Sequence, residues 1–70
     1  MPYTDNEDLP ASVRNHLPAH AQDIYRAAFN HAYARYADDP DQEQRAHQIA
    51  WGAVKRSYVK IDGEWVPAPR

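Results

Sequence analysis

The chain carries four histidines, at positions 16, 20, 31 and 47, and histidine is the residue most able to bind a metal or move a proton near neutral pH. A helical metal pair needs two histidines one turn apart on one face, and Pro18 breaks the helix between His16 and His20. His31 and His47 have no partner at a ligand spacing, and the chain has no cysteine. The spacing therefore predicts neither a metal site nor a catalytic histidine. We expect His20 and His47 to be hydrogen-bonded at the margin of the core and to titrate near neutral pH.

The acidic stretch from Asp38 to Glu43 is the second candidate for cation binding. It lacks the alternating acidic ligands, the turn glycine and the terminal glutamate of an EF-hand. Helix capping explains the same residues, with Asp39 as the N-cap, Pro40 at the first helical position, and acidic side chains near the positive end of the helix dipole. Calcium binding is therefore not expected here.

Residues for nucleophilic or phosphate chemistry are also missing. The two glycines, Gly52 and Gly63, stand alone, so there is no glycine-rich phosphate loop. Ser12 and Ser57 have no matched base in the sequence. We therefore predict that the protein is not an enzyme and that it binds no cofactor.

A basic set with two tryptophans nearby in sequence is the one pattern typical of nucleic-acid binding. It comprises Arg45, Lys55, Arg56 and Lys60, with Trp51 and Trp65. However, the formal net charge is −2, and cations in the last turn of a helix also complement the helix dipole. Nucleic-acid binding therefore stays open as the alternative function.

Apolar periodicity predicts the helices that must position these residues. A chain of 70 residues is expected to form one domain over 1–70, with most of its large apolar side chains used for folding. Prolines punctuate it into a short helix at about 10–16, a long helix at about 18–37 and another at about 40–57. The second helix presents alanines with Ile24, Tyr25 and Phe29, and the third presents alanines with Ile49 and Val54. The two long helices should pack as an antiparallel pair.

After Tyr58 the period changes to alternation. Residues 59–61 and 64–66 are separated by Asp62-Gly63, which is a strong signal for a two-residue β-hairpin. A lone hairpin is only marginally stable, so we expect it to pack on the helices, with Tyr3 or Trp65 covering the core. The predicted fold class is mainly α, a small α+β arrangement of a short N-terminal helix, two long antiparallel helices and a small C-terminal hairpin.

Two long spaced motifs in this order resemble the ChaB family, and the likeness covers nearly the whole chain. The matching residues are Leu9, Pro10 and Val13, then Leu17-Pro18-x-His20-Ala21-Gln22-x-Ile24-Tyr25-x-x-Ala28-Phe29-Asn30, then Ala46-His47-x-x-Ala50-Trp51-x-x-Val54-Lys55-x-x-Tyr58-x-Lys60, together with the opening Met1-Pro2-Tyr3. The resemblance implies a small helical protein with a minor β element and no known catalytic residues. It also implies a cation transport regulator, associated with a sodium/calcium–proton antiporter and acting from its cytoplasmic side. Related proteins have nucleic-acid contexts, which keeps the alternative in view.

The expected function is a non-enzymatic, cytoplasmic module that contacts a protein partner and does not insert into a membrane. Aromatic residues exceed what two alanine-lined helices need, and Tyr, Trp and Arg are enriched at interface hot spots. The candidate contact residues are Tyr33, Trp51, Lys55, Arg56 and Trp65, although Trp51 and Trp65 could instead close the core. A nucleic-acid module would use Arg26 and Asn30 to read bases, and a structural dimer is a third reading. The sequence leaves the oligomeric state open.

Overall fold

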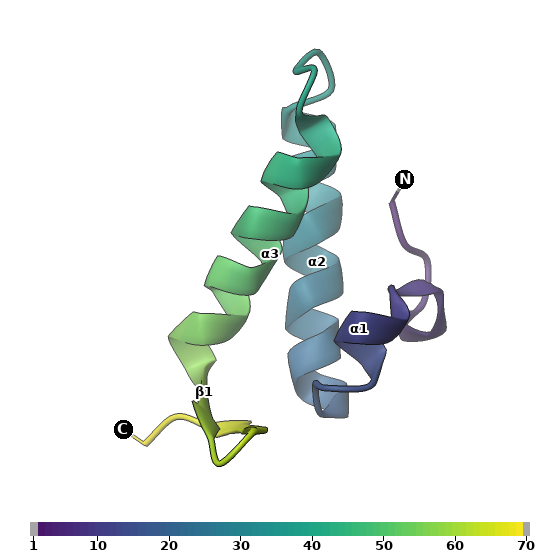
Figure 1. The fold of residues 1–70 in the computed structure, drawn as a ribbon. Coiled ribbons are helices and arrows are strands. Elements are labelled where there is room, and N and C mark those ends of the chain that lie inside the picture. Colours follow the sequence, from purple (N-terminus) through teal and green to yellow (C-terminus); the bar gives the residue numbers. More distant parts are fainter. Residues whose placement is uncertain (1, 70) are drawn as a thin grey trace.

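Two long helices, α2 (Ala19–Arg35) and α3 (Gln42–Ser57), lie side by side as an antiparallel pair in the computed structural model (Figure 1). The structure describes residues 2–69, so Met1 of the opening motif lies outside it. A short helix, α1 (Ala11–Arg14), crosses the N-terminal end of α2, and a hairpin of β1 (Tyr58–Ile61) and β2 (Glu64–Pro67) follows α3. This order confirms the predicted fold class.

Proline and aspartate set the helix boundaries. Pro10 and Pro18 are the N-cap residues of α1 and α2, one position before the first helical residue. The prediction for Asp39 was wrong: α3 begins at Gln42, with Asp41 as its N-cap. Asp39 instead accepts a hydrogen bond from the Asp41 amide at 2.7 Å and pairs with Arg45 at 2.8 Å. The Asp39 side chain therefore stabilises the turn that contains Pro40, just before the helix.

Alanines let the two long helices approach closely, as the periodicity predicted. Tyr25 and Phe29 of α2 and Val54 of α3 are fully buried. The core is completed by Leu9, Val13, Leu17, Ala21, Ala32, Ala46, Ala50 and Tyr58. Ile49 was predicted on this face but is 41% exposed, because it lies at the edge of the helical stripe centred on Ala46 and Ala50.

The N-terminal segment is more ordered than its polar sequence indicated. It contains a 3-10 helix, η1 (Asn6–Asp8), and places the Tyr3 ring 4.7 Å from that of Phe29. The Asn30 side chain accepts from the Tyr3 amide and donates to the Tyr3 carbonyl, both at 2.8 Å. Tyr3 therefore covers the core, as expected, and these contacts hold the N-terminal segment against α2.

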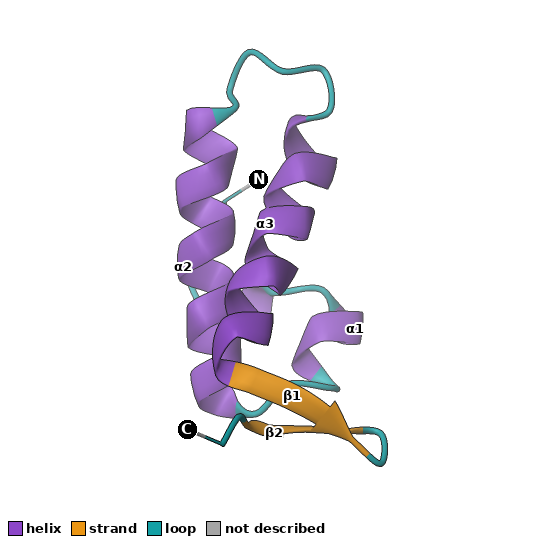
Figure 2. Ribbon diagram, turned by 90° about the vertical axis from the view of Figure 1, so that its left-hand side faces the viewer, coloured by secondary structure: helices purple, strands orange, loops and turns teal. Residues whose placement is uncertain are grey.

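The hairpin forms at the predicted turn. Asp62 (φ 52°) and Gly63 (φ 83°) both have positive φ, as a type I′ turn requires. The register pairs Ile61 with Glu64 and Lys60 with Trp65. Figure 2 shows the hairpin lying across the lower end of the helix pair, where the buried Tyr58 joins it to α3.

Candidate functional site: a tryptophan and lysine cleft

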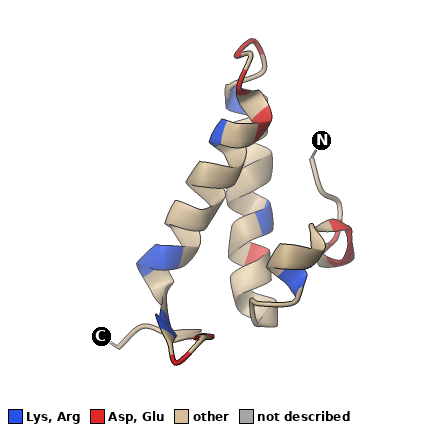
Figure 3. Ribbon diagram, in the orientation of Figure 1, with Lys and Arg blue, Asp and Glu red and all other residues tan. Residues whose placement is uncertain are grey.

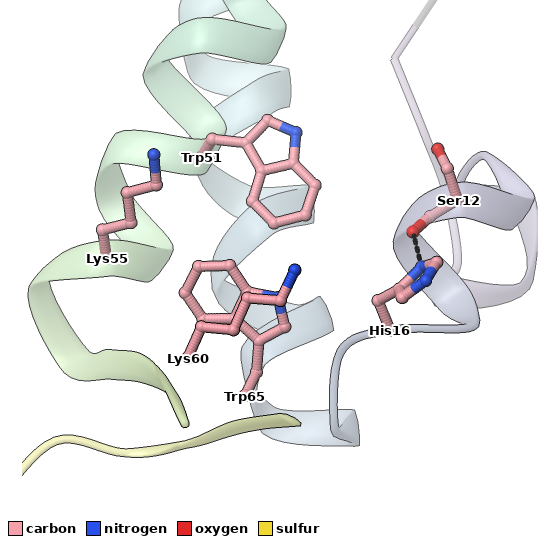
Figure 4. Close-up of a pocket in the computed structure, with 6 residues that line it drawn as sticks. All are labelled: Ser12, His16, Trp51, Lys55, Lys60 and Trp65. Carbon is pink, nitrogen blue, oxygen red and sulfur yellow. Dashed lines mark hydrogen bonds between the residues drawn. The ribbon is translucent and has the colours of Figure 1, made fainter. Parts of the chain in front are cut away.

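A surface cleft of about 330 Å³ lies where α1, the end of α3 and the hairpin meet. It is lined by Ser12, His16, Trp51, Lys55, Lys60 and Trp65. Figure 4 shows the two indoles between α1 and the C-terminal half of α3, with the Lys60 side chain alongside Trp65. Both tryptophans and both lysines of the chain thus line one cleft.

Local structure explains how four residues spread over 15 positions come together. Trp51 and Lys55 are four residues apart on α3, so they share one helical face. Lys60 and Trp65 are paired directly across the hairpin, so their side chains lie on the same face of the sheet. Tyr58 is two residues before Lys60 on that face and is buried, which turns this face toward the helices.

The two indoles form the apolar part of the cleft. Their ring centroids are 5.8 Å apart with an interplanar angle of 33°. Trp51 also meets the buried Tyr25 ring edge-on, at 5.2 Å and 79°. Both tryptophans pack against the core while remaining partly exposed. One side of the indole pair is therefore anchored in the core and the other faces solvent.

The cations of the cleft have no acidic partner within it. The ion pairs found among residues 2–69 are Arg26 with Asp23 at 3.9 Å and Arg45 with Asp39 at 2.8 Å, and neither involves Lys55 or Lys60. His16 donates a hydrogen bond from its Nδ1 to the Ser12 carbonyl oxygen at 2.6 Å, as drawn in Figure 4. An anionic group could therefore approach two free ammonium groups beside an aromatic wall.

The five predicted contact residues do not all line this cleft. Trp51, Lys55 and Trp65 are together in the cleft. Arg56 lines a separate cavity of about 410 Å³ with His20 and Tyr58. Tyr33 stacks on Phe29 with centroids 5.7 Å apart, so it belongs to the packed aromatic cluster between the helices.

Three cleft residues were absent from the predicted contact set: Lys60, Ser12 and His16. Lys60 could have been added from sequence, because a two-residue turn at Asp62-Gly63 places it opposite Trp65. Ser12 lies in α1 and His16 just after it, and no local pattern indicated that this segment lines the same cleft as the hairpin.

The two histidines expected at the core margin, His47 and His20, differ in their burial and their hydrogen bonding. The Nδ1 of His47 is hydrogen-bonded to the Tyr25 hydroxyl, as expected for a histidine at the core margin. Burial lowers the pKa of His47, against a smaller opposing effect of Glu43. For His20 the prediction was wrong: it is exposed, with its ring 6.4 Å from that of Tyr58 and no side-chain hydrogen bond among the described residues.

The side chains required by the nucleic-acid alternative are already engaged. Arg26 donates to the Thr4 carbonyl oxygen, and the Asn30 side chain is hydrogen-bonded to both the N–H and the carbonyl oxygen of Tyr3. The basic set is also divided, since Arg45 lies at the other end of α3 over the Tyr36 ring, at 5.8 Å. The basic set is therefore split between the two ends of α3 and does not form one continuous face.

Residues 2–69 also bear on a metal site and on a membrane-spanning segment. They contain no cluster of three or more histidine or acidic side chains placed to hold a metal ion. Within the same residues, no helix has the length and apolar character needed to cross a membrane.

Comparison with known proteins gives a consistent match over most of the chain. A sequence profile of the ChaB family matches residues 9–68. The Escherichia coli K12 protein named "Putative cation transport regulator ChaB" is 49% identical over 70 residues, covering 91% of this chain and 92% of that protein. An uncharacterized 10.9 kDa protein of Lymantria dispar multicapsid nuclear polyhedrosis virus is 39% identical, covering 96% of this chain and 65% of that one.

A solved structure also matches this chain over most of its length. It is the NMR solution structure of "the putative cation transport regulator ChaB", with a TM-score of 0.85 and 45% sequence identity. The match covers 97% of this chain and 100% of that chain. The overall fold is therefore shared with a relative of known structure.

Proposed function

Because this chain belongs to the ChaB family, we propose that it is a non-enzymatic accessory protein that regulates a sodium/calcium–proton antiporter by binding its cytoplasmic side. The names of its relatives support a role in cation transport, and the resemblance of its motifs points to an antiporter. The proposal also places the chain in the cytoplasm, as one domain over residues 1–70.

The observation that carries this proposal is the cleft that gathers both tryptophans and both lysines. Tryptophan supplies a large contact area, and hot spots of protein interfaces are enriched in it. Trp51 is held by the buried Tyr25, so this part of the surface is already organised before a partner binds. The contact surface proposed here consists of Trp51, Lys55 and Trp65, joined by Lys60, with Arg56 in the neighbouring cavity and Tyr33 as a more distant member.

Transport measurements test the proposal. Everted membrane vesicles that contain the antiporter, and lack the native regulator, are supplied with the purified protein, and cation–proton exchange is followed with a pH-sensitive dye. We expect the wild-type protein to change the rate of exchange and Trp65→Ala to remove most of that change. Ile49→Ala is the matched control, because Ile49 is also a partly exposed apolar residue of the helix pair but lies outside the cleft. An exchange rate that does not respond to the wild-type protein would contradict the proposal.

A further inference from the structure

The cleft combines an aromatic wall with a confined positive charge, and this combination limits what can bind there. We propose that it binds a short acidic segment of the protein partner, in which carboxylates flank one aromatic or branched aliphatic side chain. This inference rests on the function proposed above and adds the chemistry of the partner.

The size of the cleft fits a side chain with its neighbours. A volume of about 330 Å³ is at the lower end of the range of small-molecule pockets, roughly 300 to 1,000 Å³. The apolar surface available is that of the two indoles, 5.8 Å apart and both partly exposed. One aromatic or aliphatic side chain can cover this wall, whereas a large ligand would extend into solvent.

The positive charges of the cleft favour acidic residues on either side of the partner's apolar side chain. Lys55 reaches it from α3 and Lys60 from the hairpin, so the two ammonium groups approach the indoles from different elements. His16 is the third titratable group in the lining, and no acidic residue lines the cleft. Carboxylates on both sides of an apolar side chain would each find a cation, and a basic segment would be repelled.

The surroundings disfavour a long polyanion or an anionic membrane surface. Outside the lining of the cleft, Asp62 and Glu64 are at the tip of the hairpin, and Asp5, Glu7 and Asp8 are in or next to η1. Figure 3 shows acidic positions on both of these elements. The formal net charge of the chain is −2. An extended phosphate backbone or a bilayer would reach beyond the cleft toward acidic elements of a negatively charged chain, whereas a short segment needs to contact only the lining of the cleft.

Binding of synthetic peptides to the full chain tests the inference directly. The probe is a capped pentapeptide Glu-Glu-Phe-Glu-Glu, followed through the tryptophan fluorescence and through the two indole N–H signals in NMR spectra. The comparison peptides are Gln-Gln-Phe-Gln-Gln, which lacks the charges, and Glu-Glu-Gly-Glu-Glu, which lacks the ring. We expect saturable binding of the probe alone, weakened by added salt.

Neutralising the lysines gives the sharper test, because both are exposed and their loss should not unfold the protein. Lys55→Gln and Lys60→Gln should each weaken probe binding by about 2- to 5-fold, which corresponds to one solvent-exposed ion pair. Arg35→Gln is the matched control, since Arg35 is an exposed cation at the end of α2, away from the cleft, and its loss should leave binding unchanged.

Four outcomes would overturn the inference. They are equal binding of the glutamine peptide, equal binding of the glycine peptide, equal affinities of the lysine variants and the wild type, and tighter binding of phosphatidylglycerol vesicles or of a single-stranded oligothymidylate than of the probe. Failure of the proposed function is a separate result: it is an exchange rate that does not respond to the wild-type protein, and it can be found whether or not the peptide binds.

Discussion

The molecule contains two aromatic clusters with different surroundings. The inner cluster lies between α2 and α3, where Tyr25, Phe29 and His47 are in mutual ring contact and Tyr3 and Tyr33 close its sides. The outer cluster is the pair Trp51 and Trp65 at the lower end, beside two lysines. The inner rings contribute apolar burial and one internal hydrogen bond, whereas the outer rings keep one side in solvent next to unpaired cations.

Trp51 connects the two clusters through its edge-on contact with Tyr25. A rigid inner cluster therefore holds one wall of the outer one in place. Aromatic side chains in this protein can thus serve stability or recognition according to what surrounds them. The inner cluster should govern the free energy of unfolding, and the outer cluster should govern binding.

Truncation of the inner cluster should have the largest effect on stability. Phe29→Ala removes a fully buried ring and should lower the free energy of unfolding by about 3 to 5 kcal/mol, enough to unfold much of so small a domain. Trp65→Ala removes a partly exposed ring and should cost roughly half as much or less. Urea unfolding followed by circular dichroism measures both values. Equal losses would mean that Trp65 belongs to the core.

High pH should weaken the inner cluster selectively. Burial raises the pKa of Tyr25 to about 12 from its ordinary value of 10.0. Because the folded-state pKa is above the unfolded one, this contribution to the free energy of unfolding is complete below pH 10 and is lost as the pH rises from 10 to about 12. Unfolding experiments at a series of pH values should show this decline, and Tyr25→Phe should reduce it. A decline of the same size in the variant would exclude Tyr25 as its source.

Acid should also destabilise the inner cluster, through protonation of His47, and by less than high pH does through Tyr25. Burial lowers the pKa of His47 below 6.5, so the unfolded state binds a proton more readily than the folded state. Stability should be complete above pH 6.5 and should decrease as the pH falls toward the folded-state pKa. Thermal unfolding between pH 7.5 and pH 5 checks this slope. His47→Gln should flatten it, whereas His31→Gln, a change at an exposed histidine, should not.

The lysines of the outer cluster should have the smallest effect on stability. Lys55→Gln and Lys60→Gln break no ion pair found among the described residues, so each should change the free energy of unfolding by less than about 0.5 kcal/mol. Urea unfolding of the two variants measures this. A loss above 1 kcal/mol for either lysine would mean that the cleft is part of the stabilising structure.

Sequence periodicity predicted the inner cluster well, because a helical face depends on local spacing. Tyr25 and Phe29 were expected in the core and are fully buried there, and the Asp62-Gly63 turn was expected where both residues have positive φ. Capping was predicted less well: Asp39 and Asp41 are both suitable N-cap residues by type, and in the structure Asp41 is the N-cap whereas Asp39 pairs with Arg45.

The cleft could be predicted only in part. Trp51 with Lys55, and Lys60 with Trp65, follow from helix and hairpin spacing. The meeting of these two pairs, and the position of α1 at the same cleft, depends on tertiary contacts between residues far apart in the chain. For the same reason the segregation of Tyr33 and Arg56 from the cleft was not visible in the sequence.

An NMR titration tests most directly whether binding belongs to the outer cluster. The isotope-labelled chain is titrated with the detergent-solubilised antiporter, and the loss of each backbone and indole N–H signal is followed while the partner is substoichiometric. The signals of Trp51, Lys55, Lys60 and Trp65 should broaden first, and those around the loop from Asp38 to Asp41 should broaden last. Uniform broadening, no broadening, or broadening that begins at that loop would contradict the assignment of binding to the cleft.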